Sequence, residues 1–415
     1  MSNFWIHPKH ARAKSYQELL EDLRTEEGIY AYVLDNDPYK VAVKIIHSLI
    51  RGKHIELLDS DLSVDELCRL NVDVARVNTI NPTSQLDLST VDQLFDLVEK
   101  NKHNWSISIY TSGTTGKPKR VKHSFDSLTR DIRIGTRYAG HIWAFAYNLT
   151  HFAGIQVFLQ AFLNRNTIVY IFDQNRTTMM DTFEVYGITH ISATPTFYRT
   201  VLPMMERPID SVFRVTFGGE KFDSGLVETI TKMFPNAKLT NVYASTEAGA
   251  LFSSKGQLFE IPEDIYHSIC IAEDGELLLH ESLLGSAGDY ILQDGWYHTG
   301  DIVEVIEEKK IRFSARKTEM INVGGYKVNP HEIEEELLTL KEIKNVTVKP
   351  RANKVIGNIV VAEVVLSDGI TIEEKKLQQL IQSFLKDKLQ SWKIPRIVKI
   401  VDTIESTRTG KKVRR

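Results

Sequence analysis

The chain of 415 residues contains only two cysteines, Cys68 and Cys270, which stand far apart in the sequence. Two cysteines cannot make a disulfide framework or a four-cysteine zinc or iron–sulfur site. We therefore expect two buried thiols in a reducing cytosol. The first residues also lack the apolar stretch of a secretory signal peptide, which favours a cytoplasmic protein.

A strong net charge is also lacking. Lys and Arg number 51 and Asp and Glu 54, so the formal net charge is −3. This balance argues against a large basic surface for nucleic acid or anionic lipid. Hydrophobic residues make up 42% and charged residues 25% of the chain, as in ordinary globular proteins and unlike disordered ones.

One stretch, residues 138–164, has no charged side chain and is long enough to cross a bilayer. It contains His141, Asn148, His151 and two glutamines, however, which a helix facing lipid would tolerate poorly. We expect no membrane span here. The stretch predicts a buried strand, a turn and a buried helix beside a cleft.

Alternating strand and helix patterns indicate the fold class. Strand patterns at 28–36 and 53–61 flank an amphipathic helix pattern at 38–52, which predicts a parallel β–α–β unit. Short strand patterns follow at 167–173, 190–195, 212–219 and 239–244, most of them separated by helical patterns. We expect an α/β protein whose large N-terminal domain has doubly wound sheets and binds ligands at the carboxyl ends of its strands.

The pattern changes after Asp301. Residues 301–316 read as a charged hairpin, and Asn329-Pro330-His331-Glu332 has the residues of a helix start. Two further strands and a long helix around residues 377–385 complete a small α+β segment. We expect a large domain over 1–316 and a small C-terminal domain over 317–415.

Residues 106–119, SISIYTSGTTGKPK, combine a strand with a loop of glycines and hydroxyl residues. Glycine lets the backbone approach an anion closely, and backbone N–H groups, hydroxyls and Lys117 and Lys119 can all face phosphate oxygens. A Walker P-loop would need Gly at Thr111 and Ser or Thr at Pro118, so that motif does not match. The loop predicts a polyphosphate site; a surface turn is the alternative.

With this loop the sequence resembles the adenylate-forming enzymes, a family of acyl- and aryl-CoA synthetases, luciferases and adenylation domains. Six matches occur in the family's order over residues 106–415: the 110–119 loop, Gly218-Gly219-Glu220, Tyr243-Ala244-Ser245-Thr246-Glu247, the segment 295–301, Arg316 with the segment 324–328, and Thr409-Gly410-Lys411. The resemblance implies an N-terminally shortened large domain and a small mobile C-terminal domain. It also implies that a carboxylate attacks ATP to give acyl-AMP and pyrophosphate, after which a thiol takes the acyl group.

The resemblance implies an ATP site made from Thr111, Ser112, Gly113, Thr114, Thr115, Gly116, Lys119, Gly218, Gly219, Glu220, Asn241, Tyr243, Asp301 and Arg316. In it Glu247 binds Mg²⁺, Thr246 contacts the α-phosphate, and Asp301 and Arg316 contact the ribose. Lys411 is the catalytic cation that neutralises charge in the transition state. For each of these residues a structural role is the alternative, such as a loop carboxylate, core packing, a surface ion pair for Arg316 or a solvated basic tail.

The second half-reaction implies a rotation of the small domain. By position Thr318 is the hinge, although the family usually has Asp or Lys there. Gly324 and Gly325 would then line a tunnel for the pantetheine arm of CoA or of a carrier protein. The sequence does not choose between these two acceptors.

The family's acyl pocket corresponds to His151, Thr194 and Gly218, with a core position as the alternative for His151. Residues 143–154 contain no Asp to bind an α-amine, which favours an aryl or fatty acid over an amino acid. The shortened N-terminal part is compatible both with a stand-alone ligase that serves a carrier protein and with a compact CoA ligase. A non-catalytic protein that binds nucleotide or acyl-AMP on the same fold is the alternative to an enzyme.

Overall fold

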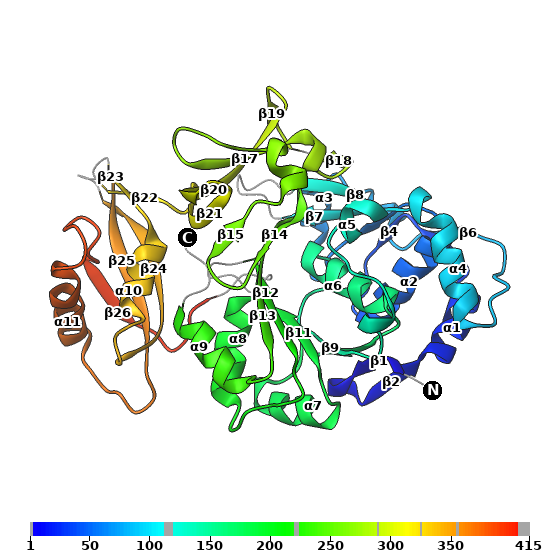
Figure 1. Cartoon of the computed structure of the whole chain (residues 1–415), viewed down its shortest axis with the longest axis horizontal. Helices are drawn as coiled ribbons and strands as arrows, with labels where there is room; N and C mark the ends of the chain where they lie inside the picture. The colour runs from blue at the N-terminus through cyan, green and yellow to red at the C-terminus, as the bar shows by residue number, and fades with distance from the viewer. Residues whose placement is uncertain are drawn as a thin grey trace. The chain divides into compact units, whose positions relative to one another are not determined.

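The computed structural model describes residues 3–111, 119–219, 224–288, 290–323, 326–353 and 357–405. The chain forms two compact units (Figure 1). The first comprises Met1–Gly256 and Leu279–Tyr297, and the second Gln257–Leu278 and His298–Arg415. The expected boundary after residue 316 lies within the second unit of this division, and the division into 1–316 and 317–415 stays a prediction.

The largest sheet of the described residues has eight strands in the order β14-β13-β12-β11-β9-β10-β1-β2. From β13 to β1 neighbouring strands are parallel, and the edge strands β14 and β2 are antiparallel. The strands are β1 (Asn3–His7), β2 (Arg12–Ser15), β9 (Ile142–Phe145), β10 (Thr167–Tyr170), β11 (His190–Ala193), β12 (Arg214–Gly218), β13 (Lys238–Ser245) and β14 (Gly249–Ser254). The strands expected after residue 167 are confirmed, whereas β1 was not anticipated.

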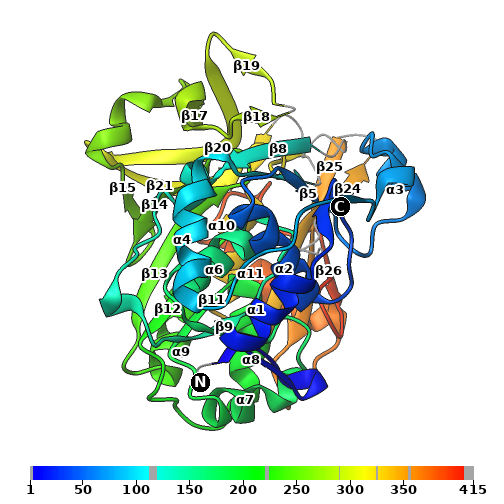
Figure 2. The same ribbon diagram turned by 90° about the vertical axis from the view of Figure 1, so that its right-hand side faces the viewer.

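Helices cover both faces of this sheet. Trp143 and Phe145 of β9 pack into a buried cluster with side chains of α1, α2, α4 and α6, while Ala144 packs into a second cluster with α7, α8 and α9. Figure 2 shows α1, α2, α4 and α6 next to one another. A parallel sheet needs such cover because both of its faces are apolar.

The α-helices described in the first unit are α1 (Tyr16–Thr25), α2 (Pro38–Ile50), α3 (Val64–Arg69), α4 (Val91–Asn101), α5 (Phe125–Thr129), α6 (Phe152–Leu163), α7 (Met179–Val185), α8 (Pro195–Val201) and α9 (Ser224–Met233). The helix expected at 38–52 is confirmed as α2, capped by the Asp37 side chain. The strand, turn and helix expected over 138–164 are confirmed as β9 and α6. Helix α4 was not predicted from the sequence.

A second sheet of the first unit carries the segment 106–119. Its order is β18-β8-β7-β5-β4, in which β4, β5 and β7 are parallel and β8 and β18 antiparallel. The strands are β4 (Tyr32–Val33), β5 (Ile55–Leu57), β7 (Ser106–Thr111), β8 (Lys119–Ser124) and β18 (Ala287–Gly288), and beside them β3 (Gly28–Tyr30) pairs with β6 (Ile80–Pro82). The expected parallel β–α–β unit is confirmed by β4, α2 and β5.

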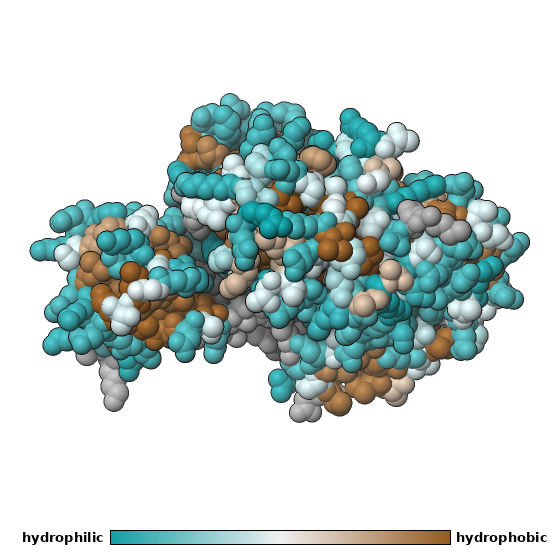
Figure 3. Space-filling model, turned by 90° about the horizontal axis from the view of Figure 1, so that it is seen from below, coloured by the Kyte–Doolittle hydropathy of each residue, from teal (hydrophilic) through white to brown (hydrophobic). Residues whose placement is uncertain are grey.

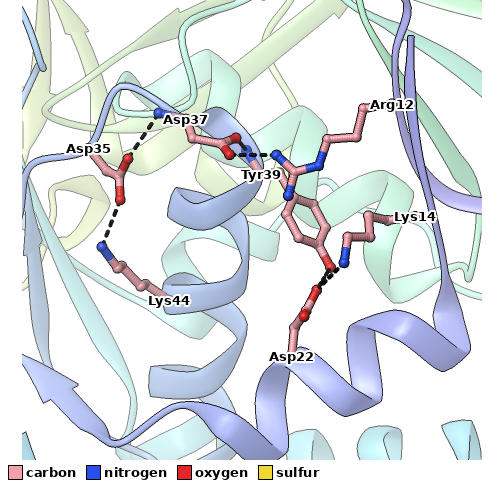
Figure 4. Close-up of polar contacts among 7 residues, drawn as sticks. All are labelled: Arg12, Lys14, Asp22, Asp35, Asp37, Tyr39 and Lys44. Atoms are coloured by element: carbon pink, nitrogen blue, oxygen red, sulfur yellow. Dashed lines mark hydrogen bonds and ion pairs between the residues drawn. The ribbon is translucent and has the colours of Figure 1, made fainter. Parts of the chain in front are cut away.

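A network of charged side chains joins the start of the chain to α1 and α2 (Figure 4). Arg12 donates to Asp37 at 2.6 Å, and Asp22 accepts both from Lys14 at 3.0 Å and from the Tyr39 hydroxyl at 2.6 Å. The nearby pair Lys44–Asp35, at 2.9 Å, lies on the other side of the α2 N-terminus. These contacts lie among side chains that are half-buried or buried, which makes them stronger than ion pairs in water.

Two further sheets lie mainly in the second unit. One has the order β15-β21-β20-β17-β16 with β19 beside β20, and the other the order β23-β22-β25-β24 with β26 beside β25. The strands are β15 (Leu258–Glu260), β16 (Ile269–Ile271), β17 (Glu276–His280), β19 (Leu292–Gln293), β20 (Trp296–Glu307), β21 (Lys310–Arg316), β22 (Ile321–Val323), β23 (Tyr326–Val328), β24 (Ile343–Asn353), β25 (Gly357–Leu366) and β26 (Ile397–Ile400). Helices α10 (Pro330–Leu337) and α11 (Glu374–Lys386) pack on the second of these sheets through Ile333, Leu377 and Ile381. The charged hairpin, the helix start at Asn329 and the α+β segment are all confirmed.

The expectation of two buried thiols is wrong, because Cys68 and Cys270 are both exposed. Cys68 lies near the end of the short helix α3, and Cys270 lies on a strand between two half-buried isoleucines. Among the described residues no helix is both long enough and apolar enough to cross a membrane. The face drawn in Figure 3 is mostly hydrophilic with scattered hydrophobic patches.

Candidate active site

Strands β7 and β8 hold the two ends of the expected phosphate loop. They form an antiparallel pair in which Thr111 faces Lys119 and Tyr110 faces Arg120. The Lys119 ammonium lies 5.8 Å from the centre of the Tyr297 ring. The loop residues Ser112, Gly113, Thr114, Thr115, Gly116 and Lys117 lie outside the described part of the chain.

Glu56 of β5 binds the base of this loop from a neighbouring strand. The Tyr110 hydroxyl donates to Glu56 Oε2 at 2.5 Å, and Arg120 donates to both carboxylate oxygens, at 3.0 and 2.6 Å. Burial works to raise the pKa of this carboxyl, but the hydrogen bonds from His54, Tyr110 and Arg120 outweigh it and lower the pKa to about 2. The charged carboxylate therefore holds both ends of the loop at neutral pH.

Gly218 and Gly219 end β12 next to β13. A Cβ atom at Gly218 would lie 2.6 Å from the Val242 carbonyl oxygen, so only glycine permits this close approach. Gly219 has a φ of +79°, in the left-handed region that favours glycine. The third residue of this motif, Glu220, lies outside the described residues.

Strand β13 and the turn after it position the expected adenine, α-phosphate and magnesium residues. Phe252 stacks on the Tyr243 ring with 5.5 Å between the ring centres and an interplanar angle of 17°. The Asn241 amide nitrogen donates to the Gly256 carbonyl at 2.9 Å, so this buried side chain also has a structural partner. Thr246 and Glu247 are half-buried in the turn directly after the strand. A carboxylate at a strand end is a suitable ligand for Mg²⁺.

His151 lies at the N-terminus of α6 and is bonded to a carboxylate that sequence analysis missed. Its Nε2 lies 2.8 Å from Asp59 Oδ2, and Asp59 also accepts from the Asn148 amide at 2.7 Å and from the Thr150 hydroxyl. Burial works to raise the pKa of Asp59, but these hydrogen bonds, led by the one from His151, leave the pKa below its ordinary value. A half-buried carboxylate thus orients the imidazole.

The carboxyl edge of the largest sheet brings several of these residues to one place. The parallel neighbours β9, β11, β12 and β13 are followed by His151, Thr194, Gly218-Gly219 and Thr246-Glu247. The Thr194 hydroxyl accepts from the Phe197 N–H at 3.2 Å and caps α8, so part of its hydrogen-bonding capacity is used locally. Ligands of parallel α/β sheets bind at this edge.

In the second unit Asp301 and Arg316 face each other across β20 and β21. Arg316 Nε donates to Asp301 Oδ1 at 2.6 Å and Nη2 lies 3.4 Å from Oδ2. The ion pair expected as the alternative for Arg316 is therefore present. The two contacts hold the Asp301 carboxylate in one orientation.

Glu276 anchors the segments on either side of this pair. The buried carboxylate accepts from the Gly300 N–H at 2.8 Å and from Lys317 at 2.7 Å, and lies 2.9 Å from His298 Nδ1. Thr318, the expected hinge, follows Lys317 in an exposed turn. The expected tunnel residues Gly324 and Gly325 and the expected catalytic Lys411 lie outside the residues that the structure describes.

Among the described residues a further group with metal-binding side chains comprises His7, His10 and Asp173, whose ligand atoms lie within 4.8 Å of one another. His7 Nε2 lies 3.1 Å from Asp173 Oδ1, and the Lys9 ammonium lies 3.1 Å from Oδ2. The ammonium competes with any cation for this carboxylate. The group lies after β1 and β10, away from β12 and β13 in the strand order.

Comparisons with known proteins agree with this geometry. Residues 31–269 match the family of AMP-binding enzymes, and residues 332–411 match the AMP-binding enzyme C-terminal domain. The chain is 23% identical over 343 residues to bacitracin synthase 3 of Bacillus licheniformis, across 73% of this chain and 5% of that protein. It is 26% identical over 337 residues to 2-succinylbenzoate–CoA ligase of Listeria innocua serovar 6a, across 74% of this chain and 69% of that protein.

Among solved structures, the o-succinylbenzoate CoA synthetase of Bacillus subtilis in complex with its acyl-adenylate intermediate OSB-AMP superimposes with a TM-score of 0.72. The identity is 19%, across 99% of this chain and 94% of that one. This likeness establishes the fold: mixed α/β, with a large N-terminal and a smaller C-terminal domain. Several further CoA ligases are matched over only 60–66% of their own length.

Proposed function

Because the chain belongs to the family of AMP-binding enzymes, we propose that it is an acid–thiol ligase. In the first half-reaction a carboxylate oxygen attacks the α-phosphorus of ATP, the bond to the β-phosphate oxygen breaks, and acyl-AMP and pyrophosphate form. In the second half-reaction a thiolate attacks the acyl carbon and AMP leaves. The observation that carries the proposal is the row of motif residues after β9, β11, β12 and β13 at one edge of a parallel sheet.

The first half-reaction depends on positioning and charge stabilisation. The 111–119 loop would bind the β- and γ-phosphates, held at its ends by the contacts of Tyr110 and Arg120 with Glu56. Thr246 would donate to the α-phosphate. Glu247 fits as a ligand of Mg²⁺, since its carboxylate is half-buried at the same strand end. The ion would supply positive charge to the phosphates.

We propose that Gly218 to Glu220 and Tyr243 bind the adenine, with the aromatic ring of Tyr243 stacked on the base. Asn241 would support this site indirectly, because its amide nitrogen donates to the Gly256 carbonyl and holds that part of the backbone in place. Asp301 would accept from the two ribose hydroxyls, and Arg316 would hold that carboxylate in place. Lys411 would neutralise the charge that develops on the carboxylate and α-phosphate.

For the acid, we propose an aryl or fatty carboxylic acid without an α-amino group, bound near His151, Thr194 and Gly218. The structure adds one aspartate to this region, Asp59, which comes from another segment. Its oxygens accept from His151, Thr150 and Asn148, so the carboxylate already has three partners that an ammonium group would have to compete with. This engagement supports the preference for acids that lack an amine.

For the acceptor, we propose CoA first, because the relatives matched over most of this chain include CoA ligases, and the phosphopantetheine of a carrier protein second. Gly324 and Gly325 would line the tunnel for either thiol. The small domain would rotate about Thr318 between the half-reactions, while Lys317, which precedes this hinge, stays bound to Glu276. We place the reaction in the cytoplasm, in keeping with two exposed free thiols, and cell fractionation would check this.

The deciding experiment is ATP–pyrophosphate exchange over a panel of aryl, fatty and amino acids, followed by thioester formation with CoA and with loaded carrier proteins. We expect exchange with an aryl or fatty acid and none with amino acids. No exchange with any acid, together with retained ATP binding, would favour a non-catalytic nucleotide-binding protein instead.

A variant tests the assigned role of the C-terminal lysine. Lys411→Ala is expected to abolish exchange and to leave thioester formation from supplied acyl-adenylate largely intact, because the cation acts only on the first transition state. Lys412→Ala, next to it in the sequence, is the matched control and should keep both activities. Equal loss of both half-reactions in Lys411→Ala would refute the role.

A further inference from the structure

Three consecutive carbonyl groups in the turn after β13 each accept a hydrogen bond from a segment that is distant in the sequence. The acceptors are the carbonyls of residues 246, 247 and 248, and their donors are His123 Nε2 at 2.7 Å, the Gly285 N–H at 2.8 Å and Arg130 Nη1 at 3.3 Å. A turn has no strand partner to bind its carbonyls, so these donors fix its backbone. The turn carries the side chains of Thr246 and Glu247.

His123 makes the shortest of these contacts and is fully buried. Burial, with a smaller effect of the Arg130 charge, lowers the pKa of His123 to about 4, although its bond to Thr246 opposes the shift. The ring is therefore neutral at pH 7. A carbonyl oxygen can only accept, so Nε2 carries the proton, and Nδ1 is the acceptor that faces Ser127 Oγ at 3.2 Å.

The position of His123 links three parts of the site. It lies on β8, four residues after Lys119 at the end of the phosphate loop. Its ring centre is 5.4 Å from that of Phe152, the residue after His151. The backbone of Gly285, which donates to the Glu247 carbonyl, also packs against β8. A Cβ atom at Gly285 would lie 2.7 Å from the Lys122 carbonyl oxygen. The loop strand and the turn with Thr246 and Glu247 are thus joined through one imidazole.

We infer that His123 is a positioning residue for adenylate formation, an inference that rests on the proposed function. Its Nε2–H group holds the Thr246 carbonyl and so fixes the directions in which the Thr246 hydroxyl and the Glu247 carboxylate point. In this role it acts through the Thr246 carbonyl and not by contact with substrate or metal. Partners that orient metal ligands in this way typically contribute about 10- to 100-fold to metal affinity or activity.

Three substitutions separate the hydrogen bond from the burial of the ring. His123→Phe keeps an aromatic ring and removes the donor. His123→Gln places an amide N–H about where Nε2 lies, and His123→Asn has the same chemistry with too short a reach. We expect Phe and Asn to lower kcat/KM for ATP in pyrophosphate exchange about 10- to 100-fold and to raise the Mg²⁺ concentration for half-maximal rate, with Gln restoring most of both.

The readouts distinguish positioning from a loss of stability. Thermal melting is measured first, and if the Phe variant does not fold, the Gln and Asn pair carries the comparison. The matched control is His190→Phe, another buried neutral histidine of the first unit, which should leave the Mg²⁺ dependence unchanged. Thioester formation from supplied acyl-adenylate should also change little in every His123 variant.

Two results would overturn the inference: equal activity of the Gln and Asn variants, or an equal loss in both half-reactions. If the wild-type protein exchanges pyrophosphate with no acid, the proposed function fails while the inference remains testable. Calorimetry with a non-hydrolysable ATP analogue, with and without Mg²⁺, then measures whether Asn weakens the Mg²⁺-dependent part of binding and Gln retains it. An unchanged Mg²⁺-dependent part in the Asn variant would contradict the role of His123.

Discussion

Glu56→Gln is the substitution with the clearest expected effect on the anchoring of the phosphate loop. Gln keeps the shape of the side chain and removes its charge. The Tyr110 hydroxyl and the Arg120 guanidinium, which now donate to the carboxylate, then lose their charged partner. Because these two residues form the base of the loop, we expect lower stability of the first unit and a higher KM for ATP.

The size of the effect follows from the pKa of Glu56. The folded protein lowers it from 4.5 to about 2, and each unit corresponds to about 1.4 kcal/mol, so the charged form contributes about 3 kcal/mol to the free energy of unfolding. Breaking a buried ion pair costs about 3–5 kcal/mol. The Arg120 side chain is 41% exposed, so water can solvate its guanidinium in the variant and reduce the loss of stability. We expect about 2–3 kcal/mol at pH 7.

The pH dependence has a definite sign. The pKa of Glu56 is lower in the folded protein than in the unfolded chain, so the unfolded chain binds the proton more readily. The contribution of Glu56 to the free energy of unfolding is therefore complete above the unfolded pKa and is lost as the pH falls toward the folded pKa. Between pH 7 and pH 4 the wild-type protein should lose about 1 kcal/mol from this group, a loss that Glu56→Gln cannot show.

Urea unfolding at pH 7 and pH 4 measures both the stability that Glu56→Gln loses at pH 7 and the stability that the wild type loses between the two pH values. Glu184→Gln is the matched control, since Arg207 donates to Glu184 at 3.0 and 2.7 Å in an exposed pair. Exposed pairs contribute about 0–1 kcal/mol, so this variant should remain close to the wild type. The reasoning is refuted if both variants lose the same stability at pH 7, or if the difference between Glu56→Gln and wild type stays constant down to pH 4.

Three further predictions concern other parts of the first unit. Asp59→Asn should raise KM for the acid more than KM for ATP, since it frees His151 and leaves the nucleotide contacts; equal increases in exchange assays would contradict this. Gly218→Ala should cost about 1–3 kcal/mol in urea unfolding because its Cβ would lie 2.6 Å from a carbonyl oxygen, whereas Gly256→Ala, with nothing within 4 Å, should cost little. His190 has a pKa lowered to about 3 by burial, His141 and Arg214, so its contribution to stability is lost as the pH falls below its unfolded value; from pH 7 to pH 5 the wild type should lose about 2 kcal/mol more than His190→Phe.

The sequence predicted the elements whose signals are local. These predictions depend on residues that are close neighbours in the sequence, and all are confirmed: the apolar spacing and proline of α2, the cap at Asn329, the charged hairpin and the strands after residue 167. Helix α4 and strand β1 were missed: α4 is polar on most of its surface, and β1 gains its place by pairing with β10, more than 150 residues away.

The same difference between local and long-range signals applies to the residues of the candidate site. Motif order identified the family, the phosphate loop, the strand-end residues and the roles proposed for them, because glycines, hydroxyls and a carboxylate at fixed spacing serve one chemistry. Glu56, Asp59 and His123 were missed, since their partners lie 54, 92 and 123 residues away. A carboxylate in a short strand and a histidine after a loop carry no local signal of such a partner.

The amino-acid order alone determined the family, the reaction class that we propose and the type of fold, because these depend on short segments that bind phosphate or form single helices and strands. Only the tertiary structure decided which polar side chains hold those segments: Glu56 beneath the loop, Asp59 behind His151 and the neutral His123 against the Thr246 carbonyl. The physical reason is that burial makes an unpaired polar group costly, so each partner is selected by the space around it and not by its distance along the chain.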